Sequence, residues 1–227
     1  PRYFSSAASD VYKRQGNVAT TFGVDKNALG PTMNGLFQAV IDGSRIDINP
    51  FVIPPERLTR WMRKAWKRQF PNRPRGPPVS HKVDSLSLLP ADLDLSGIEI
   101  ELAMRIGREH RLRIALEGAM EQFDLIIIDT PASLGLLTVN ALTAADWLLI
   151  PIQAEFYALE SMGQLLDTLR KVQSRVNPSL KLLGISMTMV QTGSNLGKMV
   201  GDSALRHFGE RILRTSIPRS VSIAEAP

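Results

Sequence analysis

Short apolar runs alternate with longer amphipathic stretches from residue 86 to the end of the chain. The runs lie at 86–89, 125–128, 148–152, 182–189 and 212–217. They are nearly continuous in their apolar character, which is typical of strands buried on both faces of a parallel sheet. Helical periodicity predicts the connecting helices near 98–121, 133–145, 158–176 and 196–208. The pattern predicts an α/β fold: a doubly wound, mostly parallel sheet with helices on both faces.

The start of the chain lacks this regularity. The first fifteen residues, PRYFSSAASDVYKRQ, show neither strand nor helix periodicity. We interpret residues 1–14 as a leader foreign to the domain, which would then occupy residues 15–227. A chain of 227 residues suits one domain of this kind, or two very small ones.

One segment accounts for the net charge of +5. Residues 57–75 contain eight Lys or Arg and no acid, whereas the rest of the chain has 19 basic and 22 acidic residues, a net charge of −3. Residues 56–70 are predicted to form an amphipathic helix that ends in the proline-rich stretch PNRPRGPP. We therefore expect a basic helical insertion and a linker at about 54–80.

Two interpretations of this basic helix are open. A cationic amphipathic helix can contact nucleic acid or an anionic membrane surface. Alternatively, the helix packs Trp61 and Trp66 against the domain, and its charges are simply solvated. We favour the second interpretation, because both tryptophans lie on the face expected to be buried.

Composition narrows the possible chemistry. The sequence has no cysteine, which excludes disulfides, thiolate nucleophiles and Cys-ligated zinc or iron–sulfur sites. Its three histidines, His81, His110 and His207, are scattered and do not indicate a metal site. No apolar run is long enough to span a bilayer, and no signal peptide is visible. We expect a cytoplasmic protein without stable membrane insertion.

The strongest local signal is FDLIIIDTPASLG, residues 123–135. A buried apolar strand delivers Asp129 to its carboxyl end, and a Thr-Pro break and a new helix follow. Ligands of open α/β sheets bind beyond the carboxyl ends of the strands. An acid in this position is typical of a Walker B aspartate, which holds Mg²⁺ beside the phosphates of a nucleotide. The alternative is an aspartate that merely caps the strand or the following turn.

This motif and its surroundings resemble the ParA/Soj family of partition ATPases. The family pattern Y-D-x-I-I-I-D-x-P-P-S-L-G, then N-A-L-x-A-A-D and P-x-Q-x-E-x-Y-A-L-E, is matched by FDLIIIDTPASLGLLTVNALTAADWLLIPIQAEFYALE at 123–160, with Ala132 in place of the second Pro. The resemblance extends to QGNVATTFGV (15–24), LLPADLDLSGIEIEL (88–102), GISMTM (184–189) and IPRSVSIAEAP (217–227).

The resemblance implies a role for several residues. Asp129 would be the Walker B acid that holds Mg²⁺, directly or through water. Thr130 and Pro131 would begin the switch that senses the γ-phosphate. Gln153 and Glu155 would shape the nucleotide pocket and the dimer interface, although they can also be read as polar residues at a helix N-terminus.

The base side of the site and the DNA contacts are implied in the same way. Pro218 and Arg219 would contact the adenine, although Ser222 and Ala224 depart from the usual family residues nearby. Relatives bind DNA without sequence preference through basic residues of the C-terminal half, each of which can equally be a solvated charge. The matching residues here are Lys198, Arg206, Arg211 and Arg214.

The phosphate-binding loop of the family, K-G-G-x-G-K-T, does not occur in the sequence. GSNLGKM (193–199) imitates it, but with three residues between its glycines and Met199 where a hydroxyl must bind Mg²⁺. VYKR stands where the family's D-x-D-P should precede Gln15, and the chain ends before the family's last strand and helix. The resemblance therefore implies a P-loop NTPase-like fold, incomplete at both ends and inactive alone.

For a complete protein, the resemblance implies an ATP hydrolase of chromosome or plasmid partition. ATP and Mg²⁺ would close a homodimer that binds DNA non-specifically on the nucleoid, and a ParB-like centromere-binding partner would stimulate hydrolysis. A non-catalytic scaffold with the same fold and a MinD-like positioning ATPase are the alternatives. The sequence does not name the cargo.

Overall fold

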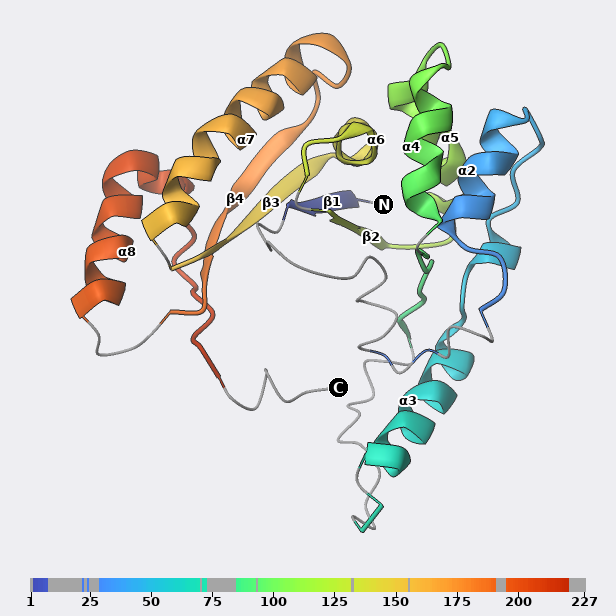
Figure 1. The fold of residues 1–227 in the computed structure, drawn as a ribbon, viewed down its shortest axis with the longest axis horizontal. Coiled ribbons are helices and arrows are strands. Elements are labelled where there is room, and N and C mark those ends of the chain that lie inside the picture. Colours follow the sequence, from blue (N-terminus) through green and yellow to red (C-terminus); the bar gives the residue numbers. More distant parts are fainter. Residues whose placement is uncertain are drawn as a thin grey trace. The chain divides into compact units, whose positions relative to one another are not determined.

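The computed structural model describes the chain in two compact units (Figure 1). Unit 1 contains the first strand and all described residues from Leu102 onward, and unit 2 contains those from Phe22 to Glu101. The described residues are 2–7, 22, 24, 29–69, 71–72, 85–92, 94–131, 133–154, 156–190 and 195–220.

Unit 1 is built around a sheet whose described strands are all parallel, in the order β2-β1-β3-β4. The strands are β1 (Arg2–Ala7), β2 (Leu125–Thr130), β3 (Trp147–Gln153) and β4 (Lys181–Thr188). Residues 212–218 extend this order, because Ile212 and Pro218 form parallel bridges with Ile185 and Val190. The predicted α/β fold with a parallel sheet is confirmed.

Helices connect these strands, as the sequence pattern predicts (Figure 1). Their bounds are α5 (Arg111–Leu116), α6 (Leu136–Ala144), α7 (Phe156–Arg175) and α8 (Asn195–Phe208), with short 3-10 turns η4 (Arg108–His110), η5 (Glu117–Ala119) and η6 (Gly209–Arg211). Alternate residues of β3 point into the core and are almost fully buried, namely Leu148, Ile150 and Ile152. The edge strand β2 differs, since Ile127 is 70% exposed on its outer face.

The expectation that residues 1–14 contain no strand is wrong for Arg2–Ala7. This segment forms β1, which pairs in parallel with β2 on one side and β3 on the other. A position between two strands supplies backbone partners on both sides, so a short segment without clear alternation can be ordered there. Tyr3 and Phe4 also have a high β propensity. Residues 8–14 lie outside the described part, and a foreign origin of the leader stays a prediction.

Two other elements differ from the sequence pattern. The helix predicted over 98–121 is broken into α4 (Leu95–Ala103), η4 and α5. The break lies at Gly107, whose left-handed φ of 64° is not compatible with a continuous helix. The strand predicted at 86–89 is reduced to one antiparallel bridge between Ile53 and Leu88, so it does not belong to the parallel sheet.

Unit 2 consists of helices around a small apolar core. Its elements are α2 (Met33–Ile41), η2 (Asn49–Phe51), α3 (Pro55–Gln69) and most of α4. The helix predicted over 56–70 is thus found as α3. None of the helices in the described ranges is both long and apolar enough to cross a membrane.

Candidate functional site

The candidate site begins with Asp129, the last residue but one of β2. Parallel strands deliver their carboxyl ends to one edge of the sheet, so Asp129 lies at the edge where ligands bind in such folds. The Asp129 side chain is exposed, whereas the next residue, Thr130, is buried. Pro131 then ends the strand, because it has no N–H to offer to the ladder. The structure thus supports the placement predicted for these three residues.

The strand register places Gln153 at the same edge of the sheet as Asp129, but further along the strand direction. Ser6 of β1 pairs with Asp129 on one side and with Leu149 on the other, so Asp129 is level with Leu149. Gln153 is the last residue of β3 and lies four positions further along. At about 3.3 Å per residue, this offset is about 13 Å, and the two intervening strand spacings add about 10 Å sideways. A ligand that touches both residues must therefore run obliquely across the end of β1.

Hydrogen bonds fix this edge at β3 and β4. The Ala154 N–H donates to the carbonyl of Thr188 at 2.9 Å, and the Thr188 hydroxyl donates to the carbonyl of Ile152 at 3.1 Å. Beyond β4, the Arg219 N–H donates to the carbonyl of Val190 at 3.0 Å. Pro218 and Arg219 therefore lie at the same edge as Asp129 and Gln153, at the opposite end of the strand order, and both are exposed.

The loop after Asp129 is tied to the helix that follows it. The hydroxyl of Thr138, a buried residue in the first turn of α6, donates to the carbonyl of Ser133 at 2.6 Å. It also lies 3.5 Å from the carbonyl of Pro131. The loop and α6 are therefore linked by a buried side chain, which sequence reasoning missed. A hydroxyl in the first turn of a largely buried helix is the signal that could have indicated it.

The donor set at this edge fits Mg²⁺. Mg²⁺ usually takes one or two carboxylates and completes its octahedral shell with water and substrate phosphates. Asp129 supplies one exposed carboxylate at the strand end. No group of three His, Asp or Glu that could hold a metal occurs among the described residues. A metal here would therefore depend on phosphate and water for its remaining ligands.

Sequence comparison places the chain among partition proteins. An AAA domain profile matches residues 75–182. The sporulation initiation inhibitor protein Soj of Bacillus subtilis is 48% identical over 145 residues, 64% of this chain and 57% of that protein. The chromosome partitioning protein ParA of Caulobacter vibrioides is 42% identical over 151 residues, 66% of this chain and 57% of that protein. The chain belongs to the ParA/Soj family.

A solved structure extends the likeness of this ParA/Soj chain to nearly its whole length. Cobyrinic acid a,c-diamide synthase from Mycobacterium smegmatis, solved with ADP and magnesium, superposes with a TM-score of 0.72. It is 30% identical, and the match covers 96% of this chain and 75% of that one. The predicted P-loop NTPase-like fold is thereby confirmed. The chain spans about 57% of the length of its Soj and ParA relatives.

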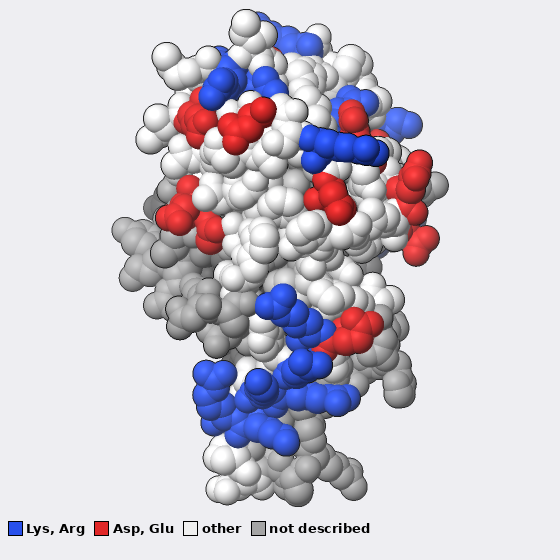
Figure 2. All heavy atoms as spheres, turned by 90° about the vertical axis from the view of Figure 1, so that its right-hand side faces the viewer, with Lys and Arg blue, Asp and Glu red and all other residues white. Residues whose placement is uncertain are grey.

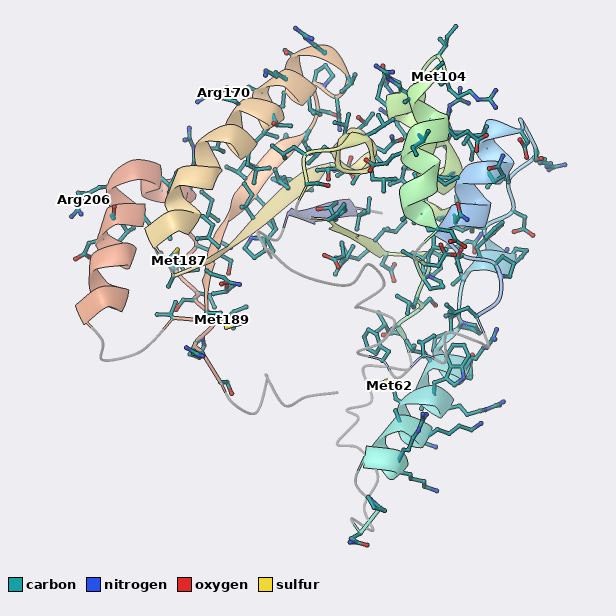
Figure 3. All side chains as sticks on the ribbon, viewed as in Figure 1. Met62, Met104, Arg170, Met187, Met189 and Arg206 are labelled. Atoms are coloured by element: carbon teal, nitrogen blue, oxygen red, sulfur yellow. The ribbon has the colours of Figure 1, made fainter. Side chains whose placement is uncertain are left out.

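The other residues implied by the ParA/Soj resemblance are scattered over the C-terminal part. Arg206 on α8, Arg211 in η6 and Arg214 after it all have exposed side chains, and Figure 3 shows Arg206 on the outer side of α8. Lys198 falls on α8, but its side chain lies outside the described part of the structure. Glu155 and Ala132 also lie outside the described residues.

The asparagine of the N-A-L-x-A-A-D motif has a structural role that the sequence did not indicate. Asn140 is fully buried in α6, and its Oδ1 accepts a hydrogen bond from the Leu112 N–H at 3.0 Å. Its Nδ2 donates to the carbonyls of Arg108 at 2.9 Å and Leu136 at 3.0 Å. Leu112 is the second residue of α5, so Asn140 caps that helix from a neighbouring element.

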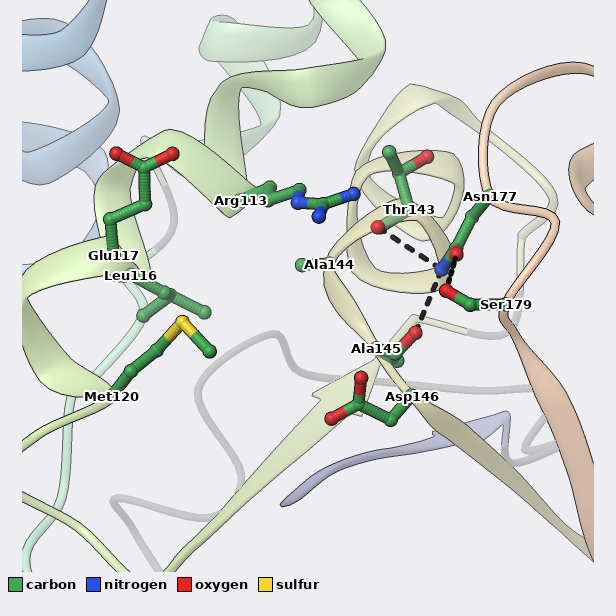
Figure 4. A pocket seen from close by; sticks show the side chains of 10 residues that line it. All are labelled: Arg113, Leu116, Glu117, Met120, Thr143, Ala144, Ala145, Asp146, Asn177 and Ser179. Atoms are coloured by element: carbon green, nitrogen blue, oxygen red, sulfur yellow. Dashed lines mark hydrogen bonds between the residues drawn. The ribbon is translucent and has the colours of Figure 1, made fainter. Parts of the chain in front are cut away.

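A second buried asparagine, Asn177, closes the other end of α6. Its Nδ2 donates to the carbonyls of Leu142 at 2.9 Å, Thr143 at 3.2 Å and Ala145 at 2.8 Å. Two of these carbonyls belong to the last turn of α6, where no backbone N–H is available. Asn177 also lines a pocket of about 180 Å³ (Figure 4). The lining residue Asp146 precedes β3, so this pocket lies at the amino edge of the sheet, away from Asp129.

Replacing Asn177 by alanine is expected to destabilise unit 1 by about 1 to 2 kcal/mol. The change removes the amide that donates to three carbonyls, but water in the adjoining pocket can donate to some of them instead. Thermal unfolding should show a decrease of about 3–6 °C in Tm. Ser179→Ala is the matched control, because it removes only the hydrogen bond from the Ser179 hydroxyl to Asn177 Oδ1. Equal losses for both variants would contradict the capping role.

Proposed function

We propose that the carboxyl edge of the unit 1 sheet forms the magnesium side and the base side of a nucleotide site, in an ATPase that partitions chromosomes or plasmids. The observation that carries the proposal is the position of Asp129 at the end of β2, beside the carboxyl end of β1. Gln153, Pro218 and Arg219 lie along the same edge. The Soj and ParA relatives support the assignment to partition.

Each residue has a definite task in this proposal. Asp129 holds Mg²⁺, directly or through water, and the metal neutralises charge on the phosphates. Thr130 and Pro131 begin the loop that responds to the γ-phosphate, and Thr138 transmits a change in that loop to α6. Gln153 lines the pocket together with Glu155, which lies outside the described residues.

The base side lies at the opposite end of the strand order. Pro218 and Arg219 contact the adenine there, where the bridge to Val190 fixes their backbone. A nucleotide with its adenine at Pro218 and Arg219 and its phosphates at Asp129 extends across the ends of several strands. Closing of a homodimer over the nucleotide is the proposed signal for DNA binding.

DNA and partner contacts complete the proposed cycle. Exposed cations of the C-terminal region bind the DNA backbone without sequence preference, as phosphate contacts do. These contacts hold the protein on the nucleoid, and a ParB-like centromere-binding protein then stimulates hydrolysis and release from the DNA. The cations are Arg206, Arg211 and Arg214, with Lys198 on the same helix as Arg206.

A non-catalytic scaffold is a second candidate function. The family's K-G-G-x-G-K-T loop does not occur in the given sequence, which spans about 57% of its Soj and ParA relatives. Such a loop supplies the backbone N–H groups and the lysine that cradle the phosphates, so a site without it loses most of its phosphate donors. The chain as printed is therefore expected to be inactive in hydrolysis when alone.

A calorimetric titration with Mg-ATP distinguishes these possibilities. The chain as printed is expected to bind negligibly, whereas the same chain with the family's upstream segment, from the K-G-G-x-G-K-T loop through D-x-D-P, fused ahead of Gln15 is expected to bind with a micromolar Kd. Micromolar binding by the unfused chain would contradict the expected dependence on the loop. Failure of the fused chain to bind would contradict the nucleotide site itself and favour the scaffold.

A further inference from the structure

Helix α3 of unit 2 is anchored by its apolar face. Leu58 is fully buried and Trp61 is 9% exposed, and both belong to a core with Val24 and Ile53. Phe22, Leu29 and Leu88 pack against this core. The prediction that Trp61 packs against the domain is thereby confirmed. The Trp66 side chain lies outside the described residues.

The opposite face of α3 is cationic and exposed. At 100° per residue, the basic side chains occupy an arc of about 140°, and the apolar residues occupy the complementary arc. Figure 2 shows Lys and Arg side chains gathered over this helix. The exposed basic residues are Arg57, Arg60, Arg63, Lys64, Lys67 and Arg68, against the single acid Glu56 in the first turn.

Arg57 marks the border between the two faces. Its guanidinium lies 4.6 Å from the centre of the Trp61 ring, which is a favourable cation–π position. Arg57 thus helps to fix the orientation of the helix on its core. The remaining cations face away from the core, held in one direction by the buried Leu58 and Trp61.

We propose that the cationic face of α3 is a docking surface for the phosphate backbone of duplex DNA. From Arg57 to Arg68 the stripe is about 16 Å long, which equals about five base-pair steps. Lys and Arg side chains at this density neutralise phosphates and release counterions, which drives association without sequence preference. The stripe lies wholly within unit 2, so the proposed contact does not depend on a nucleotide bound to unit 1.

The burial pattern favours DNA over an anionic membrane. An interfacial amphipathic helix binds a membrane by inserting its apolar face into the headgroup region. In α3 the apolar face packs in the unit 2 core through Leu58 and Trp61, which leaves these two side chains unavailable for insertion, whereas the described basic side chains are exposed. A purely electrostatic, exposed surface suits the regular row of phosphates along DNA.

This inference goes beyond the proposed function, because α3 lies outside the matched segment 75–182 and outside the C-terminal cations assigned above. Failure of the nucleotide switch would leave DNA binding by α3 intact. Conversely, loss of the α3 contact would leave Mg-ATP binding unchanged. The two proposals are therefore tested by separate measurements.

The test is the salt dependence of DNA binding without nucleotide. Binding of the full chain to a fluorescent duplex of mixed sequence is followed by anisotropy between 50 and 200 mM KCl. The variant combines Arg60→Gln, Arg63→Gln, Lys64→Gln and Lys67→Gln, and it retains Arg57, Leu58 and Trp61. Glutamine keeps a good helix propensity, so α3 should persist. With about 0.9 counterion released per contact, the slope of log K against log salt should become about 3.6 units shallower.

Two further variants separate the proposed surface from general charge effects. The first combines Arg45→Gln, Arg113→Gln, Lys171→Gln and Arg175→Gln, which neutralises four exposed cations outside α3 and should leave the slope nearly unchanged. The second combines Arg206→Gln, Arg211→Gln and Arg214→Gln in the C-terminal region. An equal loss in the first of these variants, or a loss confined to the second, would overturn the proposal for α3.

Two outcomes do not depend on the α3 variant folding correctly. A wild-type slope shallower than about 3.6 units would leave too few phosphate contacts for the stripe and would overturn the proposal. So would binding to vesicles of phosphatidylcholine and phosphatidylserine that is tighter than binding to the duplex. A steep wild-type slope with weak vesicle binding supports DNA as the partner.

Discussion

Replacing Asp129 by alanine is expected to lower ATP hydrolysis at least about 100-fold, in a form of the chain that carries the family's upstream segment, from the K-G-G-x-G-K-T loop through D-x-D-P, ahead of Gln15. Asp129 offers the exposed carboxylate at the end of β2, where a metal would meet the phosphates. Without that carboxylate, Mg²⁺ loses its protein ligand and the charge of the transferring phosphoryl group is less well compensated. The measurement is the rate of phosphate release at saturating Mg-ATP.

Asp124 provides the matched control for this experiment. It is also exposed, but it precedes β2 and so lies at the amino edge of the sheet. Asp124→Ala should leave hydrolysis within about twofold of the parent, because its carboxylate is remote from the carboxyl edge. If the Asp129→Ala form hydrolysed ATP at the rate of the parent, the assignment of Asp129 as the metal ligand would be contradicted.

Replacing Asn140 by alanine is expected to destabilise unit 1 by about 3 to 4 kcal/mol. The change leaves the Leu112 N–H and the Arg108 carbonyl without their partner. Asn140 is fully buried and does not line the pocket beside Asn177, so water is poorly placed to replace it. The cost should therefore exceed that of Asn177→Ala, with a decrease in Tm of about 10 °C.

Hydrogen exchange resolves where this loss occurs. Amides of β3 should exchange faster in Asn140→Ala, whereas amides of α3 in unit 2 should change little. Asn49→Ala is the control, because Asn49 is exposed and its side-chain amide donates to the nearby Asp47 carboxylate, a bond that water can replace. A Tm decrease for Asn140→Ala no larger than that for Asn49→Ala would show that the cap on α5 contributes little.

The sequence predicted those parts of the fold in which hydrophobic pattern and local turn chemistry agree. The runs at 125–128, 148–152 and 182–189 became β2, β3 and β4, as apolar segments of this length do in a parallel sheet, although the expected burial on both faces is wrong for β2, where Ile127 is exposed. The placement of Asp129 followed directly from the end of such a run. Amphipathic periodicity likewise located α3 to within a residue at each end.

The parts that failed depend on interactions distant in sequence. β1 is ordered between β2 and β3, more than a hundred residues away along the chain, and no local pattern shows that partnership. The single Gly107 interrupts a periodic stretch that otherwise continues from α4 to α5. Apolar content alone did not show that residues 86–89 pair only with Ile53, away from the parallel sheet.

The buried asparagines show why part of the site region could not be predicted. Asn140 was visible as a motif residue, but its partners Leu112 and Arg108 lie on another element. Asn177 carried no motif at all, although it satisfies three carbonyls around the end of α6. Polar residues within apolar surroundings indicate a buried network, but only the structure identifies its partners.

The separation of two faces on α3 has a consequence for how this protein can evolve. The buried face, with Leu58 and Trp61, determines whether unit 2 keeps its core, and the exposed face carries charge without such a constraint. Apart from Arg57, which packs on Trp61, single substitutions among the exposed cations should therefore have little effect on stability, since exposed positions usually change it by less than about 0.5 kcal/mol. Lineages could then raise or lower polyanion affinity one charge at a time without approaching the stability threshold for folding.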